Sequence, residues 1–393
     1  MKLLFLTARF PYPPLKGDQV RGYHQLRLLA QRHSITLLSF ARRDLPAEAR
    51  RTIEGFGVEV ITVPMRYPAM ATGVLGGAFS AYPLQTLLYQ SALMRRTLAG
   101  LLIRRSFDLA HVQLARMAPY LEQQANLPRV IDLIDALSLN MERRYRRDRS
   151  PMRLAAYIEW RRLRQYERAI CGRYDNVVVV SDIDRAAIGE FPNLHVIPIG
   201  VDLTSFPLAV EGREPYTIVF SGNMGYFPNI NAVRWFTQEV WPLVRATEPR
   251  ARFMIVGANP HPAVQALAHE SGIEVTGLVP SIHTYLSRAT LAVVPMQAGS
   301  GMQFKVIEAM ACGTPVVVTS FALGGIAAID GQHLLVCDTA QAFAASVLRL
   351  LHDSDARAKL AAQGRILVEE CYTWERTVAS IESLYLSARQ SHV

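Results

Sequence analysis

The chain has 393 residues, of which half are hydrophobic and 19% are charged. This length suggests two or three domains, and the composition suits packed cores and excludes a disordered chain. The net charge is +9, so nucleic acid or an anionic membrane must be considered as a partner. No run reaches the roughly 18 consecutive apolar residues of a transmembrane helix.

The four cysteines form no CxxC pair and the ten histidines form no HExxH pair. Scattered thiols of this kind are typical of a cytosolic protein, and we expect no metal site. The N-terminal apolar run is too short for a secretory signal and reads as a first strand. We therefore expect a cytoplasmic protein.

Short apolar, β-branched runs alternate with segments of helical spacing along the first half. Strands are predicted at residues 2–8, 34–40, 58–64, 108–113, 129–135 and 176–181. A helix is predicted over 23–32. Apolar strands that alternate with helices indicate a parallel sheet covered on both faces.

The Gly- and Pro-rich stretch 196–215 predicts an interdomain linker, after which the pattern restarts. Strands are predicted at residues 216–222, 252–258, 273–278, 291–296, 315–320 and 334–338, and a helix over 232–245. The chain ends in an amphipathic helix with Thr373 as a candidate N-cap. The prediction is an α/β protein with two doubly wound, Rossmann-like domains, which would place a ligand cleft at the carboxyl ends of the strands.

The stretch "GSGMQFKVIEAMACGTPVVV" (299–318) places Lys305 and Glu308 in or beside an apolar helical run. Burying an unpaired charge costs several kcal/mol, so each needs a partner. A Gly-rich turn before a helix suits phosphate, Lys305 adds a positive charge, and Glu308 can accept two hydrogen bonds from a ribose diol. The alternative is an internal Lys305–Glu308 pair.

Residues 141–168 hold ten Arg against four acidic residues. The run lacks a nucleic-acid motif, so nucleic acid is the least favoured partner. A solvated helix, with Tyr157, Trp160 and Leu163 facing the core, is the default interpretation, and contact with an anionic membrane is the second. The weakly polar segment 67–89 of the same half would fit membrane contact.

The chain resembles the retaining glycosyltransferases of the GT-B fold, family 4. The most specific element is "KVIEAMACGTPVVVT", similar to the donor-site signature E-x7-E followed by A-M-A-x-G-x-P-V-V. Further matches are "IPIGVDLTSF", "FSGNMGYFPNINAVRWF", "VTGLVPSIHTYLSRATLAVVP" and the terminal "YTWERTVASIESLY". In "GSGMQFKVIEAMACG" and "PYPPLKGDQVRGYHQLRLLA" the chain is closest to a bacterial, exopolysaccharide-associated branch.

This resemblance implies two domains facing across a cleft. Residues 1–200 would form the acceptor-side domain, 201–372 the donor-binding domain, and 373–393 a helix returning to the first domain. It implies a nucleotide-diphosphate sugar, UDP- or GDP-linked, as the donor substrate, no cofactor or metal, and a glycan or lipid-linked acceptor. Retention would follow front-face transfer, in which the donor phosphate takes the acceptor proton.

The resemblance also implies roles for single residues. Glu308 would bind the ribose and Lys305 would stabilise the diphosphate, because "SGNMGYFPNIN" lacks the family's usual Arg and Lys. Ser300 replaces the first acid of E-x7-E, which usually contacts the donor sugar. The donor-binding residues expected on this basis are Gly17, Gly222, Asn223, Gly277, Val279, Ser300, Gly301, Met302, Gln303, Lys305 and Glu308.

In the first half, Asp135 is the candidate acid for the acceptor, with Lys305 the other candidate catalytic residue. Asp135 could equally be the N-cap of the following helix. Gly17 belongs to a loop that would face the cleft, whereas Asp18 could simply cap its helix. Two rival functions stay open: a sugar-nucleotide epimerase, for which no paired acids are found, and a non-enzymatic scaffold that binds nucleotide or glycan.

Overall fold

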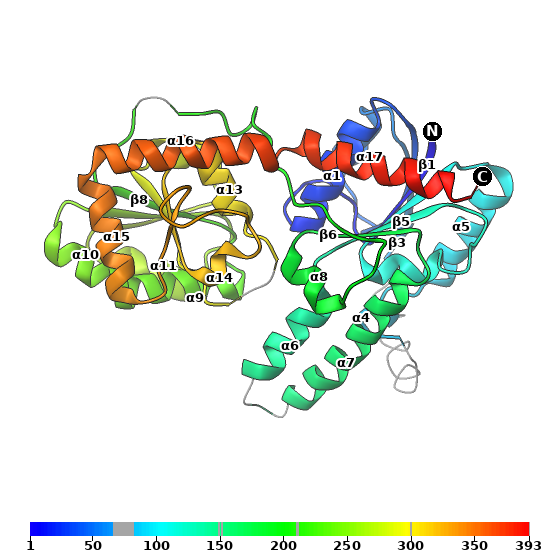
Figure 1. Cartoon of the computed structure of the whole chain (residues 1–393), viewed down its shortest axis with the longest axis horizontal. Coiled ribbons are helices and arrows are strands. Elements are labelled where there is room, and N and C mark those ends of the chain that lie inside the picture. The colour runs from blue at the N-terminus through cyan, green and yellow to red at the C-terminus, as the bar shows by residue number, and fades with distance from the viewer. Residues whose placement is uncertain (66–81, 148–149, 151, 210–211, 299–300, 393) are drawn as a thin grey trace. The chain divides into compact units, whose positions relative to one another are not determined.

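The computed structural model describes residues 1–65, 82–147, 150, 152–209, 212–298 and 301–392 (Figure 1). The chain divides into two compact units. Unit 1 comprises Met1–Pro198 and Trp374–Val393, and unit 2 comprises Ile199–Thr373. In the described ranges, no helix combines the length and apolar composition needed to span a bilayer.

Unit 1 is built on a seven-stranded parallel sheet of order β3-β2-β1-β4-β5-β6-β7. Its strands are β1 (Lys2–Thr7), β2 (Ser34–Ala41), β3 (Glu59–Pro64), β4 (Leu109–Gln113), β5 (Arg129–Ile134), β6 (Asn176–Val179) and β7 (Leu194–Val196). Its helices are α1 (Gly17–Leu29), α2 (Ala47–Glu54), α4 (Leu84–Leu87), α5 (Ala92–Arg104), the 3-10 helix η2 (Ala115–Tyr120), α6 (Leu137–Arg147), α7 (Met152–Cys171), α8 (Asp182–Ile188) and α17 (Trp374–Gln390). The central strands are buried along their whole length because helices cover both faces of the sheet.

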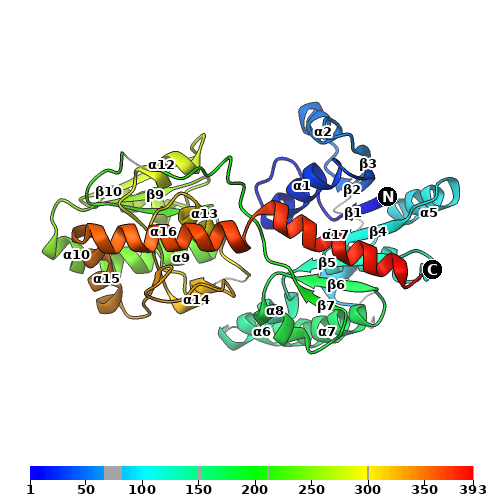
Figure 2. The same cartoon turned by 45° about the horizontal axis from the view of Figure 1, so that its top comes forward.

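The terminal helix α17 is part of the core of unit 1 rather than an appendage (Figure 2). Val378 and Ile381 are fully buried in one hydrophobic cluster with Leu26 of α1 and Val130 of β5. The hydroxyl of Tyr385 lies 2.8 Å from His111 Nδ1, in the middle of β4. Burial lowers the pKa of His111 to about 4, so the imidazole is neutral at physiological pH and acts as a core residue.

Unit 2 has a six-stranded parallel sheet of order β10-β9-β8-β11-β12-β13. Its strands are β8 (Thr217–Ser221), β9 (Arg252–Val256), β10 (Ile273–Gly277), β11 (Leu291–Val294), β12 (Val316–Val318) and β13 (Leu335–Val336). Its helices are α9 (Phe227–Trp235), the π-helical turn η3 (Phe236–Val240), α10 (Trp241–Thr247), α11 (Pro262–Gln265), η4 (Ala266–His269), α12 (Ile282–Arg288), α13 (Phe304–Ala311), α14 (Ser320–Leu323), α15 (Ala340–His352) and α16 (Ser354–Cys371).

All twelve predicted strands occur, and the predicted fold class of two doubly wound, Rossmann-like units is confirmed. The three-residue strand β7 was missed, because Leu194–Val196 is too short to show a strand pattern and is followed closely by Pro198. The single helix predicted over 232–245 is wrong in detail. It is divided by η3 just before Pro242, whose missing N–H cannot continue the α-helical ladder.

Candidate functional site

The predicted donor-binding residues of unit 2 lie where parallel strands of one sheet end. Gly222 and Asn223 follow β8, Gly277 ends β10, and α13 begins shortly after β11. The carboxyl ends of neighbouring parallel strands share one edge, which is where open α/β sheets bind ligands. The separate segments of the predicted site are therefore brought to the same edge of the sheet.

Lys305 lies in the first turn of α13, and its ammonium is held by two amide oxygens. Lys305 Nζ donates to Asn229 Oδ1 at 3.2 Å and to Gln303 Oε1 at 3.2 Å. It also lies 5.5 Å from the centre of the Phe220 ring. Burial lowers the pKa of Lys305 to about 8, opposed by the charge of Glu308. The group is thus positively charged at neutral pH and held in place by neutral partners.

Glu308 lies one turn further along α13 and is half-buried. Burial raises the pKa of its carboxyl to about 7, and the charge of Lys305 only partly offsets this. In the part of the chain that the structure describes, no hydrogen bond and no ion pair within 4.0 Å reaches this carboxylate. The internal Lys305–Glu308 contact proposed as the alternative is therefore absent among these residues, and the carboxylate keeps its capacity to accept hydrogen bonds.

Two glycines allow the strand ends to approach closely beneath Lys305. Gly222 has φ +155°, and a Cβ there would lie 2.8 Å from Asn229 Nδ2 and 3.4 Å from Lys305 Cε. Gly257, after β9, has φ +147°, and a Cβ there would lie 1.7 Å from Gly222 O. Any larger residue at either position would displace the support of Lys305, so the close approach of the strand ends requires glycine at both positions.

Asn229 was missed by the sequence analysis although it lies in the quoted segment "SGNMGYFPNIN". Its side chain is 4% exposed, and its Nδ2 donates to Asn223 O at 2.9 Å while its Oδ1 accepts from Lys305. Asn223 itself closes a turn by accepting from Gly225 N at 2.9 Å. The signal in the sequence was a buried amide in an otherwise apolar first turn of α9, which requires a specific partner.

The remaining predicted donor-binding residues vary in what they contact. Gly301 (φ +67°) and the buried Met302 precede α13, and Gln303 Nε2 donates to Gly301 O at 3.3 Å. Gly277 adopts φ +70° with open space at its Cβ position, and Val279 is half-buried. Ser300 lies outside the described residues, so its replacement of the family acid stays a prediction.

In unit 1, Asp135 follows β5 directly, after Ile134 with φ +67°. The alternative that Asp135 caps α6 is wrong. The first N–H groups of that helix are taken by two other carboxylates: Ala136 N donates to Asp184 Oδ1 at 3.0 Å, and Ser138 N donates to Glu167 Oε1 at 3.1 Å. Asp135 is therefore not used as the cap, and its catalytic role stays a prediction.

Asp135 is a carboxyl whose proton affinity is set by its surroundings. Burial raises its pKa to about 7, and the neighbouring Asp184 adds to the rise, whereas Arg21 opposes it. A carboxyl with a pKa near 7 can exchange a proton with a substrate at physiological pH. This is the property expected of a residue that assists an acceptor hydroxyl.

Near Asp135, on the preceding strand β5, Asp132 forms a buried ion pair that the sequence analysis did not identify. Arg21 Nε on α1 donates to Asp132 Oδ2 on β5 at 2.6 Å, and both side chains are fully buried. Gln25 Nε2 donates to the same oxygen at 2.8 Å. The remaining guanidinium N–H groups donate to Pro198 O at 3.1 Å and Ile197 O at 3.2 Å. One arginine thus connects α1, β5 and the end of the first segment of unit 1.

Gly17 is the first residue of α1 and is exposed, as expected for a strand-to-helix turn. Asp18, in the first turn, accepts from Arg9 at 2.9 Å and makes no N-cap hydrogen bond, because the N-cap position is Lys16. A role of Gly17 toward a ligand stays a prediction.

Residues 215–353 match the family described as "Glycosyl transferases group 1". This range contains β8, Asn229, Lys305 and Glu308, so the candidate site of unit 2 lies inside the matched domain. The match covers about a third of the chain.

Two curated proteins are similar to parts of the chain. The glycogen synthase of Mycobacterium tuberculosis is 26% identical over 213 residues, which is 50% of this chain and 49% of that protein. The phosphatidyl-myo-inositol mannosyltransferase of Propionibacterium freudenreichii is 25% identical over 232 residues, which is 56% of this chain and 58% of that protein. The chain thus spans about half the length of the curated relatives that it matches.

Solved structures match the whole chain. Sucrose-phosphate synthase from Thermosynechococcus elongatus matches with a TM-score of 0.73 at 17% identity, covering 100% of both chains. HepE of Anabaena in complex with UDP and glucose matches with a TM-score of 0.65 at 16% identity, covering 98% of both chains. These likenesses show the fold, which is GT-B, and residues 215–353 of the chain match the glycosyl transferases group 1 family.

Proposed function

We propose that the chain is a retaining glycosyltransferase that moves a sugar from a nucleotide-diphosphate sugar to a glycan or lipid-linked acceptor in bacterial polysaccharide or glycoconjugate synthesis. The observation that carries the proposal is a positive charge held by neutral amides at the start of α13, at the ligand-binding edge of the sheet. That arrangement leaves the charge available for a phosphate. The proposal assigns the donor, UDP- or GDP-linked, to unit 2.

In the proposed reaction, the bond between the anomeric carbon and the donor phosphate oxygen breaks, and the acceptor oxygen bonds to that carbon. The acceptor proton passes to the leaving phosphate on the same face. Lys305 and the N-terminus of α13 stabilise the negative charge that develops on the diphosphate, a kind of preorganised electrostatics that is often the largest catalytic contribution. Asp135 orients the acceptor hydroxyl, and the proposal requires no metal ion.

Two observations favour a ligand site over a purely structural Lys305–Glu308 pair. The Glu308 carboxylate lacks a partner among the described residues, and Lys305 is supported by Gln303 and a buried Asn229. A purely structural pair would be expected to satisfy itself. In addition, the curated relatives described above are named as sugar-transferring enzymes.

Incubation of the pure protein with a panel of UDP- and GDP-sugars tests the proposal. Release of free nucleotide that depends on an added glycan or lipid-linked acceptor supports it. Interconversion of the donor sugars without release would instead indicate an epimerase, and nucleotide binding without turnover on any acceptor would indicate a scaffold.

Glu308→Ala is expected to weaken UDP binding by about 1.5–3 kcal/mol, the range for hydrogen bonds to a charged group. The physical reason is the loss of an acceptor for the two ribose hydroxyls. Calorimetric titration measures the effect, and the 2′-deoxy nucleotide is the matched control because it removes one of the donors. An unchanged dissociation constant would make Glu308 a structural residue.

UDP binding is expected to be tightest between about pH 7 and pH 8, the pKa values of Glu308 and Lys305. Below that window Glu308 becomes protonated and accepts fewer hydrogen bonds, and above it Lys305 loses its charge. Because a phosphate ionises near a pH of about 6 itself, variants decide the assignment. In Glu308→Gln, only the acidic fall in UDP affinity that the phosphate itself causes should remain. In Lys305→Met, the alkaline fall in UDP affinity should disappear. Identical profiles in both variants would contradict the assignment.

A further inference from the structure

Helices α6 and α7 form a hairpin that extends from the body of unit 1 (Figure 1). Its base is fixed by the buried Glu167 on α7. This carboxylate accepts from Ser138 Oγ at 2.5 Å and from Ser138 N at 3.1 Å at the start of α6. The hairpin is therefore anchored in unit 1 through its base. The surface of its two helices carries exposed arginines and exposed apolar side chains.

The acids of the hairpin are used for internal contacts. Glu159 accepts from Leu84 N at 2.9 Å and from Gln85 N at 3.0 Å, which caps α4, and Glu167 holds the base. Glu142 pairs with Arg146. The described acids of the hairpin therefore leave most of its arginine charge uncompensated.

Several arginines of the hairpin are exposed and make no ion pair with a carboxylate that the structure describes. They are Arg144 on α6 and Arg153, Arg161, Arg164 and Arg168 on α7. A solvated helix normally intersperses charges of both signs to limit self-repulsion. Here one sign dominates an exposed surface, which points to a negatively charged partner.

The first turns of α7 expose large apolar side chains. Met152 is 56% exposed, Leu154 is 67% exposed and Ile158 is 44% exposed. Leu154 and Ile158 are four residues apart and so lie on the same face of the helix, with Arg161 one turn further along it. The first turns of α7 thus carry exposed apolar residues (Met152, Leu154 and Ile158), and exposed arginines follow them along the helix (Arg161, Arg164 and Arg168).

Aromatic rings come from the same turns of α7 as the exposed apolar residues and from the neighbouring α6. Tyr145, Tyr157 and Trp160 form a cluster in which the ring centres are 5.2–6.0 Å apart. The expectation that Tyr157 and Trp160 face the core is wrong: both are half-buried within this cluster, and only Leu163 is buried in the core. Tyrosine and tryptophan with a polar end are typical of the interface between lipid and water.

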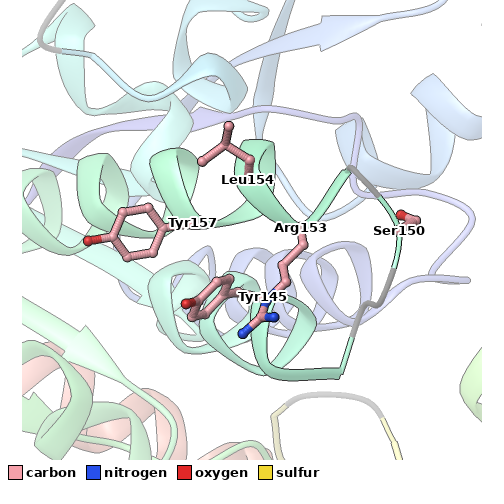
Figure 3. A pocket seen from close by; sticks show the side chains of 5 residues that line it. All are labelled: Tyr145, Ser150, Arg153, Leu154 and Tyr157. Atoms are coloured by element: carbon pink, nitrogen blue, oxygen red, sulfur yellow. The ribbon is translucent and has the colours of Figure 1, made fainter.

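A pocket of about 420 Å³ opens on this surface (Figure 3). It is lined by Tyr145, Ser150, Arg153, Leu154 and Tyr157. The Arg153 guanidinium lies 4.7 Å from the centre of the Tyr145 ring. Apolar and aromatic walls with a guanidinium against one of the rings suit the phosphate headgroup and the first part of the chains of an anionic phospholipid.

We propose that the α6–α7 hairpin binds an anionic membrane surface, with Met152, Leu154 and Ile158 entering the bilayer interface and the arginines contacting lipid phosphates. Apolar insertion and basic attraction together give reversible binding that neither achieves alone. Membrane rather than nucleic acid is favoured because an apolar end has no use on a polyanion that offers phosphates and stacked bases, whereas it is required for insertion into lipid.

The hairpin also connects the membrane surface to the candidate acid of unit 1. Helix α6 begins two residues after Asp135 and has 11 residues, which corresponds to a rise of about 16 Å at about 1.5 Å per residue. Under the proposed function, on which this step rests, the hairpin would hold Asp135 near a headgroup-linked acceptor. The membrane binding itself does not depend on that function.

Sedimentation of the full chain with vesicles tests the proposal. We expect it to pellet with vesicles of equal parts phosphatidylcholine and phosphatidylglycerol at low salt, and not with phosphatidylcholine alone. Binding should weaken as salt shortens the Debye length to about 10 Å and below. Protein that stays in the supernatant with the anionic vesicles at low salt overturns the proposal.

Matched variants separate the hairpin from net charge. The triple variant R144Q/R161Q/R164Q is expected to lower the partition coefficient on the order of a hundredfold, and L154S/I158S at least tenfold. The controls are R51Q/R96Q/R104Q, which removes the same charge from exposed arginines of α2 and α5, and I103S, whose isoleucine is 84% exposed on α5. Both controls should retain most of the binding. Equal loss in the controls and the hairpin variants would overturn the proposal.

Two further measurements keep the outcome decisive. Hydrogen exchange with anionic vesicles should protect the amides of the first half of α7, and protection confined to other elements would contradict the proposal. If the hairpin variants lose binding to single-stranded RNA while vesicle binding is unchanged, the surface is a nucleic-acid site instead. A failure of vesicle binding leaves nucleotide binding by unit 2 unaffected, so the two proposals fail separately.

Discussion

Lys305→Ala is expected to lower kcat for sugar transfer by about a hundred- to a thousandfold, the typical loss when one preorganised donor to a developing negative charge is removed. The ammonium lies at the first turn of α13, and its partners are the neutral oxygens of Asn229 and Gln303. Its attraction for the diphosphate grows as the bond to the sugar breaks, so the loss should appear in kcat more than in nucleotide affinity.

Ligands that differ by one phosphate identify the group that Lys305 contacts. UDP binding should weaken more than UMP binding in Lys305→Ala, because only UDP carries the leaving phosphate. Equal losses for the two nucleotides would contradict the assignment. Single-turnover measurements with the donor sugar separate the chemical step from nucleotide release.

Asn229→Ala serves as the matched variant that keeps the charge but removes one of its two supports. We expect about a tenfold loss of kcat with nearly unchanged UDP affinity, since the ammonium remains but is less well placed. Asn229→Asp should raise the pKa of Lys305 and shift the alkaline limb of the pH profile upward, because a carboxylate favours the charged ammonium. If Asn229 only stabilised the fold, Asn229→Asp would leave the alkaline limb of the pH profile unchanged. Asn229→Ala would then leave the ratio of kcat to UDP affinity unchanged.

The sequence predicted the architecture well because the central strands of both sheets are buried on both faces. Runs such as "KLLFLT" and "NVVVV" are nearly continuous in apolar residues, and that pattern has few other solutions. Strand β7 escaped prediction because its three residues include a histidine, and its pairing with β6 is a tertiary effect.

Lys305 and Glu308 could be proposed as a candidate donor site from the sequence, but the residues that support Lys305 could not. Lys305 and Glu308 stand out because charges in an apolar helix need partners. One partner of Lys305, Asn229, lies 76 residues away in the chain, and periodicity carries no information about which side chain meets which across a sheet. Gly222 and Gly257 could be recognised as turn residues, yet their contact with each other required coordinates.

The acids of unit 1 illustrate the same limit. The position of Asp135 before a helix made it a reasonable N-cap from sequence, since the rule considers only local residues. Two distant carboxylates, on Asp184 and Glu167, cap that helix instead. Local rules cannot predict that outcome because the competing groups are brought in by α7 and α8.

Asp132→Asn is expected to destabilise unit 1 by about 3–5 kcal/mol, the usual cost of breaking a buried ion pair. The change preserves the size of the side chain but leaves the Arg21 guanidinium buried without its counter-charge. The double variant Arg21→Met with Asp132→Leu should be much less destabilised, because neither charge remains. Urea titration with hydrogen exchange detection measures the effect separately on peptides of unit 1 and of unit 2.

The exposed pair Arg50–Glu54 on α2 is the matched control, since both side chains are in contact with water. Glu54→Gln should cost no more than about 0.5 kcal/mol, the range for an exposed i,i+4 pair, and it leaves the Arg50 hydrogen bond to Val60 O in place. A loss of similar size in Asp132→Asn would mean that water reaches the Arg21–Asp132 pair and that it contributes little.

The position of the amides that lose protection from hydrogen exchange distinguishes a positioning role of Arg21 from a contribution to overall stability. Arg21 donates to Ile197 O and Pro198 O, and Thr377 Oγ1 on α17 donates to Pro198 O at 3.0 Å. Arg21→Met in the otherwise unchanged chain should therefore expose amides at 196–199 and in the first turn of α17 before those of β1. A hydrophobic pair could hold the core together at lower cost. The ion pair differs from a hydrophobic pair because one guanidinium can fix the end of β5, which Asp135 follows, relative to both chain segments of unit 1.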